Sequence, residues 1–174
     1  MDFSNTINLI LRQLLRNLWF YGYIIRSYLF TPCNHFENYG KIMENVQILI
    51  IDDETDVLDI LSLRLSKRGA LTTCSDCGRT GLELLQNNPI DVVILDIKMP
   101  AMDGSEVLER IKEIKPDVPV IILSGHADMK LAAQVIQEGA FAYLLKPIDI
   151  DMLCNKIEDA LEHQKHLGVQ SSND

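Results

Sequence analysis

The stretch that decides the fold is VVILDIKMPAMDG, residues 92–104. Its four leading apolar residues run directly into the carboxylate of Asp96, and Pro100 and Gly104 mark the loop that follows. A short apolar run bounded by turn residues predicts a strand buried on both faces, as in a parallel sheet. Asp96 would then lie at the carboxyl end of that strand, where open α/β sheets bind their ligands. Taken alone, Asp96 fits the N-cap of the next helix equally well.

Three other predicted strands also end in chemically active side chains. The residues that follow them are Asp52-Asp53 after 46–51, Ser124 after 118–123 and Lys146 after 141–145. The carboxyl ends of parallel strands meet at one edge of a sheet, so we expect three acids, one hydroxyl and one amine to gather there. This joint pattern favours a functional site over a set of unrelated caps and turns.

From Val46 onward, strand patterns alternate with helical patterns. The apolar spacing predicts strands over 46–51, 71–74, 92–95, 118–123 and 141–145, and helices over 54–67, 80–87, 105–115, 129–138 and 150–163. Right-handed crossovers place such helices on both faces of a parallel sheet. Five βα units of this length predict a doubly wound α/β fold with strand order 2-1-3-4-5.

The first 42 residues differ in composition from the rest of the chain. They hold nine of the eleven aromatic residues, and three arginines within residues 7–30 make a bilayer span costly. Three interpretations stay open: a helical extension whose residues 7–30 contact a membrane surface or a partner protein, an extension with no conserved role, or a chain that really starts at Met43. We predict an extension over 1–42, a folded domain over 43–166 and a polar tail over 167–174.

The charge and the cysteines restrict the classes of function. The whole chain carries a net charge of −9, and residues 43–174 alone carry −11. Such an acidic domain repels phosphate backbones, which argues against direct nucleic-acid binding. The four cysteines, Cys33, Cys74, Cys77 and Cys154, form neither a dense disulfide framework nor a four-ligand zinc site, which fits a reducing cytoplasm.

The acids at the strand ends predict a metal site. Asp52, Asp53 and Asp96 would repel one another if they were crowded together, and a divalent cation removes that penalty. Oxygen-only ligands indicate Mg²⁺, which bridges to phosphoryl oxygens. Lys146 supplies a point charge for a phosphoryl oxygen, and the Ser124 hydroxyl supplies a donor. No histidine or cysteine nucleophile stands at this edge, which leaves Asp96 to form an acyl phosphate.

At this point the chain from about Val46 to His163 resembles a known family, the receiver domains of response regulators in two-component signalling, of the stand-alone single-domain type. The motifs that carry the resemblance are Asp52-Asp53, DIKMP over 96–100 with MDG over 102–104, Ser124-Gly125 and Lys146-Pro147. Their order and separations match the family along the whole domain. The resemblance implies a flavodoxin-like fold and a phospho-accepting switch.

The resemblance also implies a role for each site residue. Asp96 would accept the phosphoryl group from a sensor histidine kinase or a phosphotransfer protein. Asp53, Asp96 and the backbone carbonyl of Lys98 would bind Mg²⁺, with Asp52 acting mainly through water. Ser124 and Lys146 would contact the phosphoryl group, and Ser124 and Tyr143 would form the switch. The face built from 129–138, 141–145 and 150–163 would then meet a downstream effector protein.

Two alternatives remain beside this interpretation. One is a receiver-like scaffold that is never phosphorylated. The other is a haloacid-dehalogenase-like phosphatase, which needs a second acid two residues after the nucleophile, where this sequence has Lys98. We expect a cytoplasmic signalling switch with self-catalysed phosphoryl transfer and loss, not a turnover enzyme, with peripheral membrane association through the extension left open.

Overall fold

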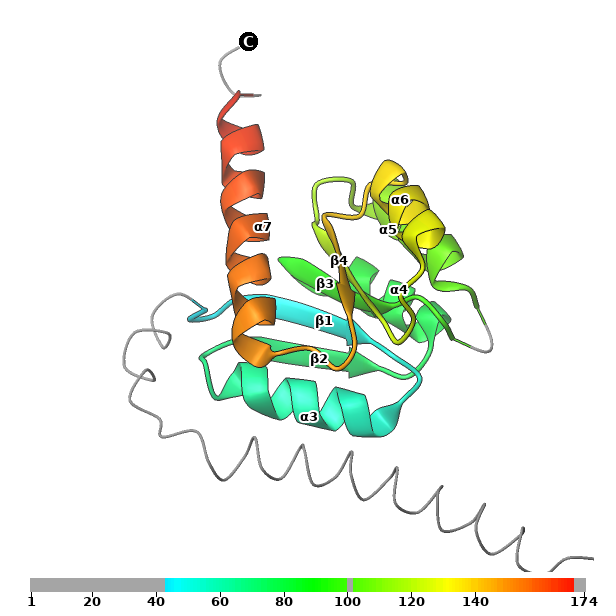
Figure 1. Cartoon of the computed structure of the whole chain (residues 1–174). Coiled ribbons are helices and arrows are strands. Elements are labelled where there is room, and N and C mark those ends of the chain that lie inside the picture. Colours follow the sequence, from blue (N-terminus) through cyan, green and yellow to red (C-terminus); the bar gives the residue numbers. More distant parts are fainter. Residues whose placement is uncertain (1–42, 100–101, 171–174) are drawn as a thin grey trace, which may run out of the picture. The chain divides into compact units, whose positions relative to one another are not determined.

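The computed structural model describes residues 43–99 and 102–170. Its centre is a sheet of five parallel strands in the order β2-β1-β3-β4-β5 (Figure 1). The strands are β1 (Gln47–Ile51), β2 (Leu71–Ser75), β3 (Val92–Asp96), β4 (Val120–Ser124) and β5 (Ala142–Leu145). The parallel pairing and the strand order confirm the doubly wound α/β fold predicted from the sequence.

Five helices cover the two faces of this sheet (Figure 1). They are α3 (Thr55–Ser66), α4 (Gly78–Asn87), α5 (Gly104–Ile114), α6 (Met129–Gln137) and α7 (Ile150–Gln170). The buried side chains of α3 and α7 share one apolar core, and those of α4, α5 and α6 share the other. The two cores therefore lie on opposite faces of the sheet, as right-handed crossovers require.

Burial on both faces explains why the central strands are unbroken apolar runs in the sequence. Successive side chains of a strand point to opposite faces, so Ile48 and Ile50 enter the core under α3 and α7. Leu49 and Ile51 enter the core under α4, α5 and α6. Strands β3 and β4 are buried at every position, whereas the edge strands β2 and β5 are partly exposed.

Two helices differ in extent from the sequence prediction. Helix α4 begins at Gly78, two residues earlier than the predicted residue 80. Gly78 is a packing residue, since a Cβ there would lie 2.6 Å from Val107 Cγ2. Helix α7 runs to Gln170 instead of His163 and includes Gly168 near its end.

Several predictions fall on residues that the structure does not describe. The extension over 1–42, with its proposed contact through residues 7–30, and the last residues of the tail, 171–174, lie outside the described ranges. Within residues 43–99 and 102–170, no helix is long and apolar enough to cross a membrane.

Candidate functional site

Three carboxylates meet at the carboxyl edge of the sheet, as the sequence predicts. Asp52 follows β1 directly, and its N–H donates to the Ser75 carbonyl of β2 over 3.1 Å. Asp96 ends β3 in the neighbouring position. Oxygen atoms of Asp52, Asp53 and Asp96 all lie within 4.8 Å of one another. Asp52 and Asp96 are only 1% and 5% exposed, while Asp53 is half-buried, so the cluster opens toward solvent on one side.

Lys146 brings its ammonium group into this cluster. Its Nζ lies 2.6 Å from Asp52 Oδ2 and 3.3 Å from Asp96 Oδ1. The backbone fixes its position, because the Lys146 N–H donates to the Ser124 carbonyl over 2.7 Å, just beyond the β4–β5 pairing. The lysine side chain is 15% exposed. The structure therefore joins the acids and the amine into one site.

For both Lys146 and Asp52, burial acts on the pKa in one direction and their mutual hydrogen bond acts in the other, and both pKa values end above their usual values. Burial alone would lower the pKa of the Lys146 ammonium, but the hydrogen bond to Asp52 and the charges of Asp52 and Asp96 outweigh it, so this pKa lies above its usual value. Burial raises the pKa of the Asp52 carboxyl, and the hydrogen bond from Lys146 offsets the effect only in part. The single positive charge of Lys146 therefore does not balance the negative charges of Asp52, Asp53 and Asp96.

The donor set fits a hard divalent cation. Three carboxylates within reach of one point supply oxygen ligands alone, which suits Mg²⁺ better than a soft metal. The Lys98 N–H donates to Asp96 Oδ2 over 3.2 Å, which orients that carboxylate. The Lys98 carbonyl stays a predicted ligand of the ion.

Ser124 and Tyr143 meet at a single backbone carbonyl. The Ser124 hydroxyl donates to the His126 carbonyl over 3.3 Å and accepts from the His126 N–H over 3.2 Å. The Tyr143 hydroxyl donates to the same carbonyl over 2.7 Å. The strand register places Leu123 beside Asp96, so Ser124 lies one residue further toward the site edge. The sequence indicated the hydroxyl and the aromatic, but no side-chain pattern could reveal the shared carbonyl.

Gly104 lies close to the backbone that follows Asp96. The Gly104 N–H donates to the Ile97 carbonyl over 3.0 Å, and Asp103 caps α5 by accepting from the Ser105 N–H. A Cβ on Gly104 would lie 2.5 Å from Ile97 Cα. This close approach explains why the loop needs glycine at that position.

Glu54 is the site residue that sequence reasoning missed. Its Oε1 lies 3.2 Å from Lys146 Nζ, so a third carboxylate shares that ammonium. The position directly after Asp52-Asp53 was the available signal, but it was assigned only to the start of a helix.

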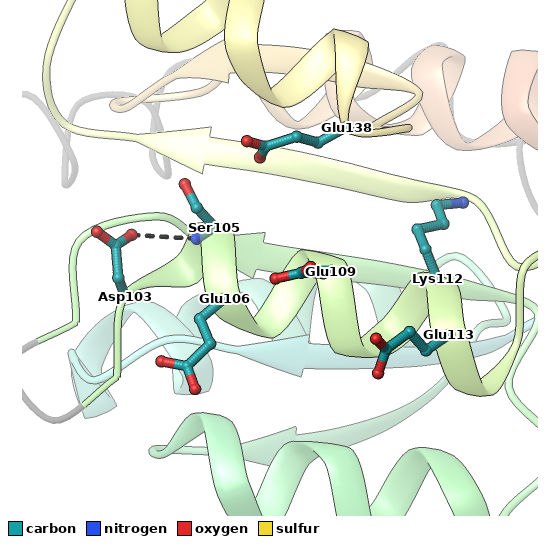
Figure 2. Close-up of a pocket in the computed structure, with 7 residues that line it drawn as sticks. All are labelled: Asp103, Ser105, Glu106, Glu109, Lys112, Glu113 and Glu138. Carbon is teal, nitrogen blue, oxygen red and sulfur yellow. Dashed lines mark hydrogen bonds between the residues drawn. The ribbon is translucent and has the colours of Figure 1, made fainter.

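Surface hollows lie near this edge but outside the acid cluster. One of about 410 Å³ is lined by Ile97, Lys98, Met99, Asp103 and Leu131, beside the loop after Asp96. A wider one of about 720 Å³ runs along α5 and is lined by Asp103, Ser105, Lys112 and four glutamates (Figure 2). Its lining includes none of the metal-binding or phosphate-binding candidates.

Comparison with known proteins decides the family. A family model described as a response regulator receiver domain matches residues 48–158. The chain belongs to this family. Similar proteins include the transcriptional regulatory protein GlrR of Escherichia coli, 38% identical over 115 residues, and the DNA-binding transcriptional regulator NtrC of the same species, 37% identical over 121 residues. The matches cover 66% and 70% of this chain but 26% of each relative, so this receiver spans about a quarter of their length.

Solved structures agree with this assignment. A CheY-like receiver domain protein from Methanospirillum hungatei is 30% identical with a TM-score of 0.68, over 71% of this chain and 98% of that one. A receiver domain protein from Clostridium thermocellum is 39% identical with a TM-score of 0.67, over 70% and 98% of the two chains. The flavodoxin-like receiver fold is therefore shown, and the chain carries a receiver domain of the response regulators of two-component signalling.

Proposed function

We propose that this receiver is a phospho-accepting switch and that Asp96 takes the phosphoryl group from a phosphohistidine of a sensor kinase or a phosphotransfer protein. The observation that carries the proposal is the meeting of Asp52, Asp53, Asp96 and Lys146 at one edge of the sheet. A buried carboxylate beside a cation and two further acids suits phosphoryl transfer better than it suits a structural cap.

The transfer itself needs little covalent chemistry from the protein. A carboxylate oxygen of Asp96 attacks the phosphorus, the phosphorus–nitrogen bond to the donor imidazole breaks, and its electron pair stays on the imidazole nitrogen. Mg²⁺, when held by Asp52, Asp53 and Asp96, supplies charge neutralisation for the phosphoryl oxygens. Lys146 holds a further phosphoryl oxygen by a charge-assisted hydrogen bond. The same site later lets water remove the group, so the chain is a switch with self-catalysed chemistry.

The switch follows from competition for the Ser124 hydroxyl. Phosphorylation replaces the Asp96 carboxylate by a phosphoryl group that itself carries roughly −1.5 to −2 charge and reaches further out, and a hydroxyl donor at the end of β4 is drawn to it. Ser124 then no longer donates to the His126 carbonyl, and the loop at His126, to which the Tyr143 hydroxyl also donates, rearranges. The group acts by favouring one of two existing arrangements, because a ligand only shifts a population.

The output would pass to a separate protein through the face of α6, β5 and α7. Apolar side chains are exposed there, with Met129 at 85%, Met152 at 53% and Leu145 at 44%. We place the protein in the cytoplasm, since Cys74, Cys77 and Cys154 are all free thiols. GlrR and NtrC are regulators of transcription, but the acidic receiver segment itself is proposed not to touch nucleic acid.

An intact-mass measurement tests the proposal. Incubation with acetyl phosphate and Mg²⁺ should add the mass of one phosphoryl group to the wild-type protein. Asp96→Asn should abolish the gain, because the attacking oxygen is replaced by an amide. Asp103→Asn is the matched control, since asparagine still caps α5 and the residue does not belong to the cluster. Full phosphorylation of Asp96→Asn would reject the proposal.

A second measurement separates the switch from a phosphatase. A haloacid-dehalogenase-like enzyme needs an acid two residues after its nucleophile, and that position is Lys98, an exposed lysine. We therefore expect no sustained release of phosphate from a phosphate ester such as p-nitrophenyl phosphate. Multiple turnovers would instead support the phosphatase.

A further inference from the structure

Glu54 stands in an unusual position for a helix-capping residue. It occupies the N-cap of α3, yet its side chain makes no capping hydrogen bond. Serine, threonine, aspartate or asparagine would normally satisfy a free N–H there. Instead, the carboxylate reaches across to Lys146, 92 residues further along the chain. The backbone carbonyl of Glu54 accepts from the N–H groups of Val57 and Leu58 in the first turn, but its side chain contacts the site and does not cap the helix.

The ammonium group of Lys146 is shared by three carboxylates of very different exposure. The side chains of Asp52 and Asp96 are 2% and 6% exposed and fixed by the strands that carry them. The side chain of Glu54 is 63% exposed, so it can swing into solvent without leaving a buried charge behind. Of the three partners, Glu54 is the one that can release the lysine.

We propose that Glu54 is a positioning residue that competes with the phosphoryl group for Lys146 and thereby slows phosphorylation of Asp96. This inference rests on the proposed function. As the donor approaches, Lys146 must turn from Glu54 toward a phosphoryl oxygen, and the negative Glu54 carboxylate also repels the anionic donor. Both effects oppose the step in which the Asp96 oxygen attacks phosphorus and the donor's leaving group departs with its electron pair.

The expected size of the effect follows from the exposure of the pair. Ion pairs with an exposed partner are worth about 0.2–1 kcal/mol, which corresponds to a rate gain of about 1.4- to 5-fold when the competitor is removed. The phosphodonor in the test is acetyl phosphate, whose acetyl–phosphate P–O bond breaks to release acetate. The rate of mass gain with Mg²⁺ is measured under single-turnover conditions.

Three variants of the full chain separate the direct contact from general charge. Glu54→Gln should phosphorylate about 1.4- to 5-fold faster than the wild type. Glu54→Asp keeps the charge but is one methylene shorter, so it should also be faster if the 3.2 Å contact matters. Asp56→Asn removes an exposed acid from the first turn of the same helix and should react at the wild-type rate.

The outcomes distinguish the two proposals. A wild-type rate in Glu54→Gln or in Glu54→Asp, or an equal gain in Asp56→Asn, overturns the role of Glu54 while leaving Asp96 as the acceptor. No phosphoryl gain in any protein, wild type included, overturns the proposed function and this inference with it. A faster rate in both Glu54 variants, with a wild-type rate in Asp56→Asn, supports competition for Lys146.

Discussion

Replacing Gly104 by alanine should damage both the fold and the site. A Cβ on Gly104 would lie 2.5 Å from Ile97 Cα, 2.6 Å from the Asp96 carbonyl oxygen and 2.9 Å from the Ile97 carbonyl oxygen. All three are main-chain atoms, so no side-chain rotation relieves the overlap. The backbone that carries Asp96 must therefore move.

The magnitude follows from two opposing terms. Overpacking in a well-packed region costs about 1–3 kcal/mol. Alanine at a compatible position would instead stabilise by about 0.4–1 kcal/mol, through the unfolded state. Because the Cβ of Gly104→Ala would overlap three main-chain atoms, we expect the overpacking cost to dominate. The net loss should be about 2 kcal/mol in the free energy of unfolding. Displacement of Asp96 should also slow its phosphorylation.

Urea unfolding followed by far-ultraviolet circular dichroism measures this loss. The matched control is Gly125→Ala, which changes a glycine of the same sheet edge, where a Cβ would meet nothing within 4 Å. Its free energy of unfolding should stay within about 0.5 kcal/mol of the wild type. If the Gly104→Ala and Gly125→Ala proteins have equal stability and equal phosphorylation rates, the argument from close approach is wrong.

Three further predictions concern groups whose environment the structure defines. Mg²⁺ at ten times its dissociation constant should stabilise the protein by about 1.4 kcal/mol in thermal unfolding, and Asp53→Asn should remove that gain. Asp76→Asn is the control and should keep the gain, because Asp76 is an exposed acid outside the cluster of Asp52, Asp53 and Asp96. Burial, followed by the charges of Glu162 and Asp159, raises the pKa of Glu158 above 4.5, and its Oε1 is buried without a hydrogen-bond partner. The folded state then binds the proton more tightly than the unfolded state, so the free energy of unfolding should fall as the pH rises from below 4.5 through the raised pKa. Glu158→Gln should remove this fall and be more stable than the wild type at pH 7. An unchanged pH profile in Glu158→Gln would contradict the assignment. Burial raises the pKa of the Cys154 thiol to about 11, whereas hydrogen bonds from the Thr80 backbone and side chain lower the pKa of the Cys77 thiol. Iodoacetamide near pH 8 should therefore alkylate Cys77 and leave Cys154 unmodified until the protein unfolds, as peptide mass spectrometry can determine.

The sequence could predict most of the fold because the relevant signals are local. The apolar run before Asp96 has the length of a strand, and the residues around Gly104 mark a turn, so each element is visible in a short window. The start of α4 was predicted two residues late, and the close packing of Gly78 against Val107 exists only in the folded chain. Local patterns carry no information about such a neighbour.

The sequence by itself determined which side chains stand at the carboxyl edge of the sheet, because each strand ends at a residue that the hydrophobic pattern identifies. Only the tertiary structure decided how those side chains pair. It joined Glu54 to Lys146 and brought the hydroxyls of Ser124 and Tyr143 to one carbonyl of His126. The physical reason is that strand ends follow from local periodicity, whereas contacts between residues far apart in the chain depend on strand register, loop path and rotamer, which exist only once the sheet has closed.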